Sequence, residues 1–83
     1  MQEVRVLFFA AARKAAGCSE AKLDCGEEGM NAAEFWQSLV GQFPNLELLR
    51  GSSRLARNAE YLADGTRILP GDEVALIPPV SGG

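Results

Sequence analysis

NAAEFWQSLVGQF, at residues 31–43, predicts the longest helix of this chain. Asn31 is the expected N-cap, and Glu34 follows three residues later, which is the spacing of a capping box. The apolar positions recur at helical spacing and are Phe35, Trp36, Leu39, Val40 and Phe43. Such a broad apolar stripe is typical of a helix that lies on a sheet. Pro44 then ends the helix.

The sequence before this helix predicts a strand followed by a short helix. Residues 3–9 alternate, and the side chains expected on the core face are Val4, Val6 and Phe8. The opposite face carries Leu7 and Phe9, which makes it unusually apolar for a surface that faces solvent. AAARKAA at residues 10–16 favours a short helix, which Gly17 stops.

The remaining elements follow from turn residues and apolar runs. We expect strands at 19–24, 55–58 and 74–77, a further helical turn at 45–50, and tight turns at 64–65 and 69–72. The two turns contain Asp64-Gly65 and Pro70-Gly71, in which glycine accepts the positive φ that such turns need. Strands on either side of one long helix predict an α+β roll with a mixed sheet.

Length and composition limit the classes of protein that this chain can represent. Its 83 residues suffice for one domain, and 47% hydrophobic residues fit a globular core. The formal net charge is −3 and the basic residues are scattered, so nucleic acid is not an expected partner. No apolar run is long enough to cross a membrane, and the first residues lack the pattern of a signal peptide. We therefore expect a cytoplasmic protein without membrane contact.

Residues that usually carry catalysis are scarce in this sequence. The chain has no histidine, no phosphate-binding glycine loop and no dinucleotide-binding fingerprint. Cys18 and Cys25 do not have the spacing of a zinc site, and we expect two free thiols near the ends of one strand. A disulfide between them is open geometrically but is not expected in a reducing cytosol. No metal site and no bound cofactor are therefore predicted.

The C-terminal segment is the remaining candidate for function. Val80-Ser81-Gly82-Gly83 follows a Pro-Pro pair that cannot donate hydrogen bonds to a strand. The five residues 79–83 can extend over about 17 Å, and glycines can thread a narrow channel because they have no side chain. We therefore divide the chain into a domain at 1–78 and a tail at 79–83. On these residues alone, a frayed terminus stays open as the alternative.

Several segments of the chain share one pattern. It begins with Val6-Leu7-Phe8-Phe9-Ala10, continues with Asn58 after a short strand, and is most specific in PGDEVA at 70–75 and IPPVSGG at 77–83. Together these segments resemble the small subunits of molybdopterin synthase, which are ubiquitin-like sulfur carriers. Arg57 departs mildly from the pattern, since that family more often has an aliphatic residue before the asparagine. The resemblance implies the β-grasp fold, in which a mixed sheet packs on one main helix.

The resemblance also implies a chemistry for the tail. An E1-like adenylyltransferase would adenylate Gly83 with ATP and magnesium, because a free carboxylate is a poor electrophile at neutral pH. A sulfur donor protein would then convert the acyl-adenylate to a thiocarboxylate. Gly82 would let the tail enter the large subunit, where Gly83 donates sulfur to cyclic pyranopterin monophosphate in molybdenum cofactor biosynthesis. The acid–base groups would belong to the large subunit, in a heterotetramer of two small, non-catalytic and two large subunits.

The resemblance to this family also implies a docking role for exposed apolar residues. Phe9, Tyr61 and Ile77 are predicted to form one surface that binds the large subunit and, alternately, the activating enzyme. Tail residues expected to contact the partner are Pro79, Val80 and Ser81. By themselves, Tyr61 and Ile77 fit equally well as ordinary half-buried residues of a sheet.

Three alternative functions stay open from the sequence. The chain can be a sulfur carrier for thiamine synthesis or tRNA thiolation, a ubiquitin-like protein modifier, or a non-covalent interaction module with an idle tail. The first two use the carboxylate of Gly83, as the molybdopterin synthase interpretation does. Deletion of Gly83 therefore separates all of these from the interaction module.

Overall fold

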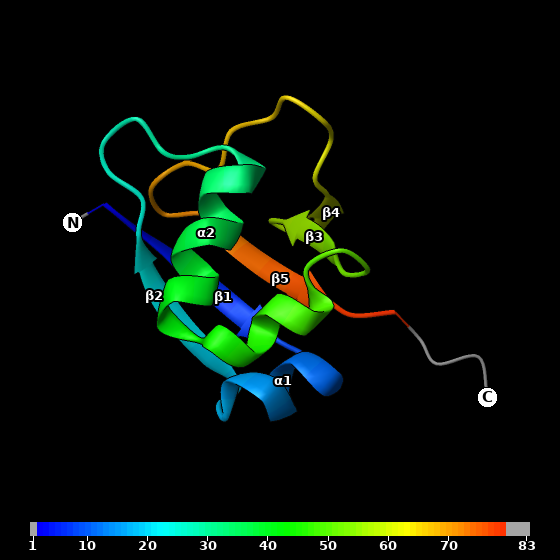
Figure 1. Ribbon diagram of the computed structural model, residues 1–83. Helices are drawn as coiled ribbons and strands as arrows, with labels where there is room; N and C mark the ends of the chain where they lie inside the picture. The colour runs from blue at the N-terminus through cyan, green and yellow to red at the C-terminus, as the bar shows by residue number, and fades with distance from the viewer. Residues whose placement is uncertain (1, 80–83) are drawn as a thin grey trace.

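The computed structural model describes residues 2–79 and builds one sheet and its helices from them (Figure 1). In chain order the elements are β1 (Glu3–Phe8), α1 (Ala11–Ala16), β2 (Glu20–Asp24), α2 (Ala32–Gln42), the 3-10 helix η1 (Pro44–Leu49), β3 (Arg54–Arg57), β4 (Glu60–Tyr61) and β5 (Glu73–Ile77). Every helix and strand expected from the sequence is present, and β4 is an additional strand.

The strands form one mixed sheet in the order β2-β1-β5-β3-β4. β1 and β5 are parallel neighbours, with Arg5 opposite Glu73 and Phe8 opposite Leu76. The other neighbouring pairs are antiparallel. α2 lies over one face of the sheet, which we call the inner face, and the opposite face is the outer face (Figure 1). This arrangement confirms the predicted α+β roll.

The core fills the space between α2 and the inner face. Its fully buried side chains include Val4, Val6, Phe8, Phe35, Leu39, Val74 and Leu76. Phe8 also packs edge-to-face against Phe43, with ring centres 5.4 Å apart. Burial of one such large side chain stabilises the fold by about 1.5–3 kcal/mol. The core face predicted for the first strand is therefore confirmed.

α2 begins with the predicted capping box. The side-chain Oδ1 of Asn31 accepts a hydrogen bond from the backbone N–H of Glu34 at 2.8 Å. In return, Glu34 Oε1 accepts from the backbone N–H of Asn31 at 2.9 Å. These two bonds satisfy N–H groups that the first turn of a helix leaves without partners. The start of α2, and with it the position of the apolar stripe, is thereby set by two residues.

A polar cluster joins the end of β3 to the beginning of β5. Arg57 Nε lies 3.0 Å from Asp72 Oδ2, and Asn58 Nδ2 donates to Asp72 Oδ1 at 3.1 Å. The backbone N–H of Leu69 also donates to Asp72 Oδ2, at 2.8 Å, within the predicted Pro-Gly turn. The backbone N–H of Glu73 donates to Asn58 Oδ1 at 3.0 Å. Asn58 therefore ends β3 with both polar atoms of its amide bonded.

The second half of the chain differs from prediction in its details. β3 begins and ends one residue earlier than expected, and the helical turn predicted at 45–50 is a 3-10 helix that begins at Pro44. The unpredicted β4 forms a hairpin with β3, in which Arg57 is opposite Glu60. Its two loop residues, Asn58 and Ala59, both have positive φ, at 50° and 73°. Such values are typical of the type I′ turn that matches the twist of a hairpin.

The two cysteines lie at opposite ends of β2. At about 3.3 Å of rise per residue, their Cα atoms are on the order of 20 Å apart, whereas a disulfide needs less than about 7 Å. The geometry therefore excludes the internal disulfide and confirms two free thiols. Burial raises the pKa of the Cys25 thiol, whose Sγ lies 3.4 Å from the carbonyl oxygen of Gln2. Separately, no helix within residues 2–79 has the length and apolarity to cross a membrane.

Candidate functional site

The predicted tail, residues 79–83, begins two residues after Ile77, the last residue of β5. Pro78 is buried and Pro79 is exposed, so the chain leaves the core between these two residues. The tail residues Val80, Ser81, Gly82 and Gly83, on which the expected chemistry depends, lie outside the described residues. The described part of the candidate site is therefore the surface around the end of β5.

An apolar row crosses the outer face of the sheet. Successive side chains of a strand point to opposite faces, so the residues between the core positions share this face. Leu7 lies opposite Ala75, Ala75 opposite Ala56, and Ala56 opposite Tyr61. These four residues, which we call the outer row, come from β1, β5, β3 and β4. Tyr61, at the edge of the sheet, is 58% exposed.

The ends of β1 and β5 extend this row with two larger side chains. Phe9 follows Phe8 and Ile77 follows Leu76, and because Phe8 and Leu76 are paired, Phe9 and Ile77 lie at the same end of two adjacent strands. Phe9 is 48% exposed, and Ile77 is half-buried. Two of the predicted docking residues are therefore neighbours on one surface.

Arg54 connects the third docking residue to the other two. Arg54 is opposite Ile77 in the β3–β5 pair, and its guanidinium carbon lies 4.0 Å from the centre of the Tyr61 ring. This is the geometry of a cation–π contact. Tyr61 is two strands away from Ile77, so the predicted surface is larger than its three residues and includes the arginine between them.

Four further residues of this surface were not predicted as docking residues, and the sequence indicates their position to different degrees. Leu7 stands out by its place in an alternating strand. The sequence does not indicate on which face Ala56 and Ala75 lie, because alanine is common on either face of a strand. In the structure Ala56 is buried and Ala75 is half-buried. Arg54 could be placed beside Tyr61 only through the β3–β4 pairing, and that hairpin has none of the usual turn sequences.

The backbone after Phe9 is strained. Ala10 has φ 50° and ψ −124°, a conformation that residues with a Cβ adopt rarely. The backbone N–H of Ala12 donates to the carbonyl oxygen of Phe9 at 3.0 Å and closes a tight turn there. This turn ends β1 and starts α1 within a few residues. The exposed ring of Phe9 therefore stands at a sharp corner of the chain.

Charged side chains bound the outer face at its other end. Arg5 Nε donates to Glu20 Oε2 at 2.7 Å, and Arg5 Nη1 donates to Glu73 Oε2 at 3.2 Å. The hydrogen bond to Glu20 and its negative charge raise the pKa of the Arg5 guanidinium above its ordinary value. The arginine stays charged at all physiological pH values, so the ion network persists. The apolar surface therefore ends between Leu7 and Arg5.

This surface has the character of a docking site. It combines the exposed aromatic rings of Phe9 and Tyr61 with Arg54, and these residue types are enriched in protein interfaces. Within residues 2–79, the buried thiol of Cys25 has a raised pKa and is a poor nucleophile. The arrangement can bind a partner, and the chemistry expected of this chain rests on the C-terminal residues beyond it.

The chain is similar to known proteins over nearly its whole length. The model of the ThiS family matches residues 6–83. The molybdopterin synthase sulfur carrier subunit of Arabidopsis thaliana is 40% identical over 81 residues, which cover 98% of this chain and 83% of that protein. The match to the family model includes both terminal glycines.

Solved structures share the fold. SAMP1 from Haloferax volcanii, a small archaeal modifier protein, matches with a TM-score of 0.83 and 31% identity, covering 98% of this chain and 99% of that chain. A complex of subunits 1 and 2 of molybdopterin-converting factor from Helicobacter pylori contains a match with a TM-score of 0.65 and 22% identity, over 98% and 99% of the two chains. The second likeness shows the fold alone. Together these matches confirm the predicted ubiquitin-like β-grasp fold.

Proposed function

This chain belongs to the ThiS family, and we propose that it is the sulfur carrier subunit of a molybdopterin synthase. The observation that carries the proposal is the exposed apolar surface around the end of β5, the strand that leads into the glycine pair. The similarity to the Arabidopsis sulfur carrier subunit over 98% of this chain supports it. The subunit supplies sulfur, and its partner supplies the catalytic groups.

Gly83 is the residue that carries the sulfur in this proposal. Its carboxylate attacks the α-phosphorus of ATP in the active site of an E1-like enzyme, with magnesium, and pyrophosphate leaves. Sulfur at the oxidation level of sulfide, supplied as HS⁻ by a donor protein, then attacks the acyl carbon, and AMP leaves to give a thiocarboxylate. Thiocarboxylate sulfur is a good nucleophile without a base on this chain, which suits a sequence that has no histidine. In the large subunit the sulfur bonds to cyclic pyranopterin monophosphate, and water then cleaves its bond to the acyl carbon, which restores the carboxylate of Gly83.

The outer face docks the carrier onto its partners. Phe9, Tyr61 and Ile77, with the rest of the outer row, bind the large subunit, and the same surface binds the activating enzyme at a different time. Within the tail, Pro79, Val80 and Ser81 contact the partner where the tail enters it. Gly82 fits the narrowest part of the partner's channel because it has no side chain. The complex of two small and two large subunits follows from the resemblance to this family.

The mass of the C-terminus tests the proposal. The untagged chain is purified from cells that contain an intact activating enzyme, and its intact mass is measured. We expect a fraction in which one oxygen of Gly83 is replaced by sulfur. Its complete absence would count against every carrier function, including the pathways for thiamine and thiolated tRNA.

Changes at the two termini separate a working tail from an idle one. Deletion of Gly83, or addition of one residue after it, is expected to abolish molybdenum cofactor synthesis in cells. Addition of one residue before Gln2 is the matched control and is expected to leave synthesis intact. Survival of synthesis in the Gly83 variants would instead support the non-covalent interaction module.

A covalent protein modifier is the second candidate function. It is favoured by the likeness to the Haloferax modifier protein at 31% identity. Its signature is an isopeptide bond between Gly83 and a lysine of another protein, which tryptic peptide mapping detects. Because both functions start from an adenylated Gly83, one chain can support both, and the relative amounts of thiocarboxylate and conjugate decide which predominates.

A further inference from the structure

Charges are distributed unevenly between the two ends of the strands. We call the end where β1 and β5 finish, beyond Phe8 and Ile77, the tail end. β1 and β5 are parallel to each other and antiparallel to β2 and β3. The strand register therefore assigns most charged side chains to the tail end or to the opposite end.

Basic side chains at the tail end are exposed and unpaired. Arg13 and Lys14 lie on α1, which follows β1, and Arg54 begins β3 opposite Ile77. In the described part of the chain, none of the three has a carboxylate within salt-bridge distance. The acidic side chains at this end are already engaged, Glu20 with Arg5 at 2.7 Å and Glu47 with Arg50 at 3.9 Å.

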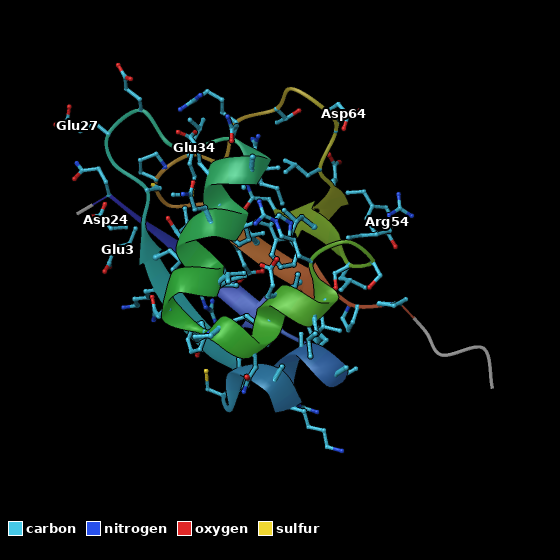
Figure 2. The ribbon with its side chains drawn as sticks, viewed as in Figure 1. Glu3, Asp24, Glu27, Glu34, Arg54 and Asp64 are labelled. Carbon is cyan, nitrogen blue, oxygen red and sulfur yellow. The ribbon has the colours of Figure 1, made fainter. Side chains whose placement is uncertain are left out.

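The opposite end is acidic. Its exposed or half-buried carboxylates include those of Glu3, Asp24, Glu27, Glu28 and Glu34, besides Asp72 and Glu73, which pair with Arg57 and Arg5. Figure 2 shows Glu3, Asp24 and Glu27 on the side of the molecule away from Arg54. Arg67, which lies near this end, donates its N–H groups to the carbonyl oxygens of Glu28 and Gly29. Among residues 2–79, Lys22 and Arg67 also lack a carboxylate within salt-bridge distance and lie outside the tail end. Carboxylates outnumber basic side chains there, so the tail end has an excess of positive charge and the opposite end an excess of negative charge.

The distance between the two ends makes this separation effective. A strand of six residues spans about 20 Å, which is about twice the Debye length of 8–10 Å at physiological salt. A partner that touches the tail end therefore experiences mainly Arg13, Lys14 and Arg54, although the whole chain has a net charge of −3. The same partner repels the acidic end when its own surface is negative.

We propose that Arg13, Lys14 and Arg54 form a basic collar that docks on an acidic protein surface around the opening that receives the tail. This proposal rests on the proposed function, since it assumes that the tail enters a partner. The collar attracts the acidic rim while the acidic end is repelled, so the carrier approaches tail first. Arg54 is held on the Tyr61 ring and joins the collar to the apolar docking surface.

A protein partner fits the collar better than nucleic acid does. Nucleic-acid sites need a stripe of basic side chains that neutralises several phosphates. Here the collar has three charges on a chain that is acidic overall. An acidic rim needs only a few complementary charges, because its role is to raise the rate of productive encounters.

Association kinetics with the large subunit encoded in the same genome test the collar. The full chain and a charge-swapped variant, R13E/K14E/E27K/E28K, have the same net charge. We expect the swap to slow association about tenfold or more at 0.01 M salt. The two rates are expected to converge near 1 M salt, where the Debye length is about 3 Å. Equal rates at low salt would overturn the collar.

Neutral substitutions provide the matched controls. R13Q/K14Q keeps the helix-forming character of α1 and is expected to slow association, whereas E27Q/E28Q is expected to change it less than twofold. Changes of equal size and opposite sign would mean that only net charge matters, which overturns the proposal. Circular dichroism verifies that each variant is folded.

Further outcomes distinguish failure of the collar from failure of the proposed function, and protein binding from nucleic-acid binding. Wild-type binding at 1 M salt without any charge dependence at low salt refutes the collar and leaves the proposed function standing. No wild-type binding at any salt refutes both. A labelled single-stranded RNA is the third probe, and its tight binding to wild type but not to R13Q/K14Q would assign these residues to nucleic acid instead.

Discussion

The inner and outer faces of the same strands differ in the size of their side chains and in what covers them. Val6, Phe8, Val74 and Leu76 face inward and are fully buried beneath the helices. The outer row has alanines on β5 and β3, with Leu7 and Tyr61 on either side of them. Large side chains thus fill the core, and small ones occupy the middle of the outer face, where Ala56 is buried and Ala75 is half-buried.

This difference separates stability from binding within one sheet. Large inward side chains contribute most of the hydrophobic stabilisation. Small outward ones add little apolar area to water in the free protein, yet they allow another backbone or side chain to approach closely. Neighbouring residues of β5 should therefore respond to substitution in opposite ways, which the following predictions test.

Leu76→Ala should give the largest change in stability. The side chain is fully buried, so its truncation leaves a cavity and is expected to lower the free energy of unfolding by about 2–5 kcal/mol. Urea denaturation monitored by Trp36 fluorescence measures it. A loss below about 1 kcal/mol would mean that the inner face is not the main source of stability.

Ile77→Ala, one residue later, should spare stability and weaken binding. Ile77 is half-buried on the outer face, so we expect at most about 1 kcal/mol of destabilisation. The dissociation constant of the variant for the large subunit is expected to rise about tenfold or more, as for a residue central to an interface. Calorimetric titration gives the binding constant. Unchanged affinity would remove Ile77 from the docking surface.

Asp72→Asn tests the polar cluster between β3 and β5. The carboxylate accepts hydrogen bonds from Leu69 and Asn58 and pairs with Arg57. Loss of its charge is expected to cost about 1–3 kcal/mol of stability, measured by thermal unfolding, without a change in partner affinity. Asp64→Asn, in an exposed loop, is the control and should be neutral.

Ala59→Gly should produce the smallest effect, in the stabilising direction. Ala59 has φ 73°, which costs an L-residue about 1 kcal/mol and glycine almost nothing. A rise of about 0.5–1 kcal/mol is expected in the free energy of unfolding. Ala63→Gly, where φ is not positive, should instead destabilise slightly. If β4 serves mainly to present Tyr61, A59G leaves binding unchanged.

Most of the core could be predicted from the sequence, because both periodicities are explicit in it. Val4, Val6 and Phe8 alternate, and Phe35 and Leu39 recur at helical spacing. Burial of these residues follows from the pattern alone. The capping box of Asn31 and Glu34 likewise depends only on neighbours in sequence, so the start of α2 was predicted correctly.

The remaining features depend on pairing that local sequence does not encode. β4 was missed because its hairpin places Ala59, rather than glycine, at a position with positive φ. Without β4, Tyr61 has no known neighbour, and the contact of Arg54 with its ring could not be foreseen. The docking roles of Phe9, Tyr61 and Ile77, and the sulfur-carrying role of Gly83, remain predictions.

The parallel pairing of β1 with β5 has a consequence for synthesis on the ribosome. Arg5 and Glu73 bond each other across 68 residues of chain, and β3 also has β5 as a neighbour. A nascent chain that lacks β5 therefore leaves β1 and β3 without their shared partner, and such long-range contacts form late in folding. Chains broken off before Glu73 cannot close the sheet and become targets for proteolysis. Because β5 is the central partner and the last strand in chain order, the sheet can form only after β5 has been synthesised.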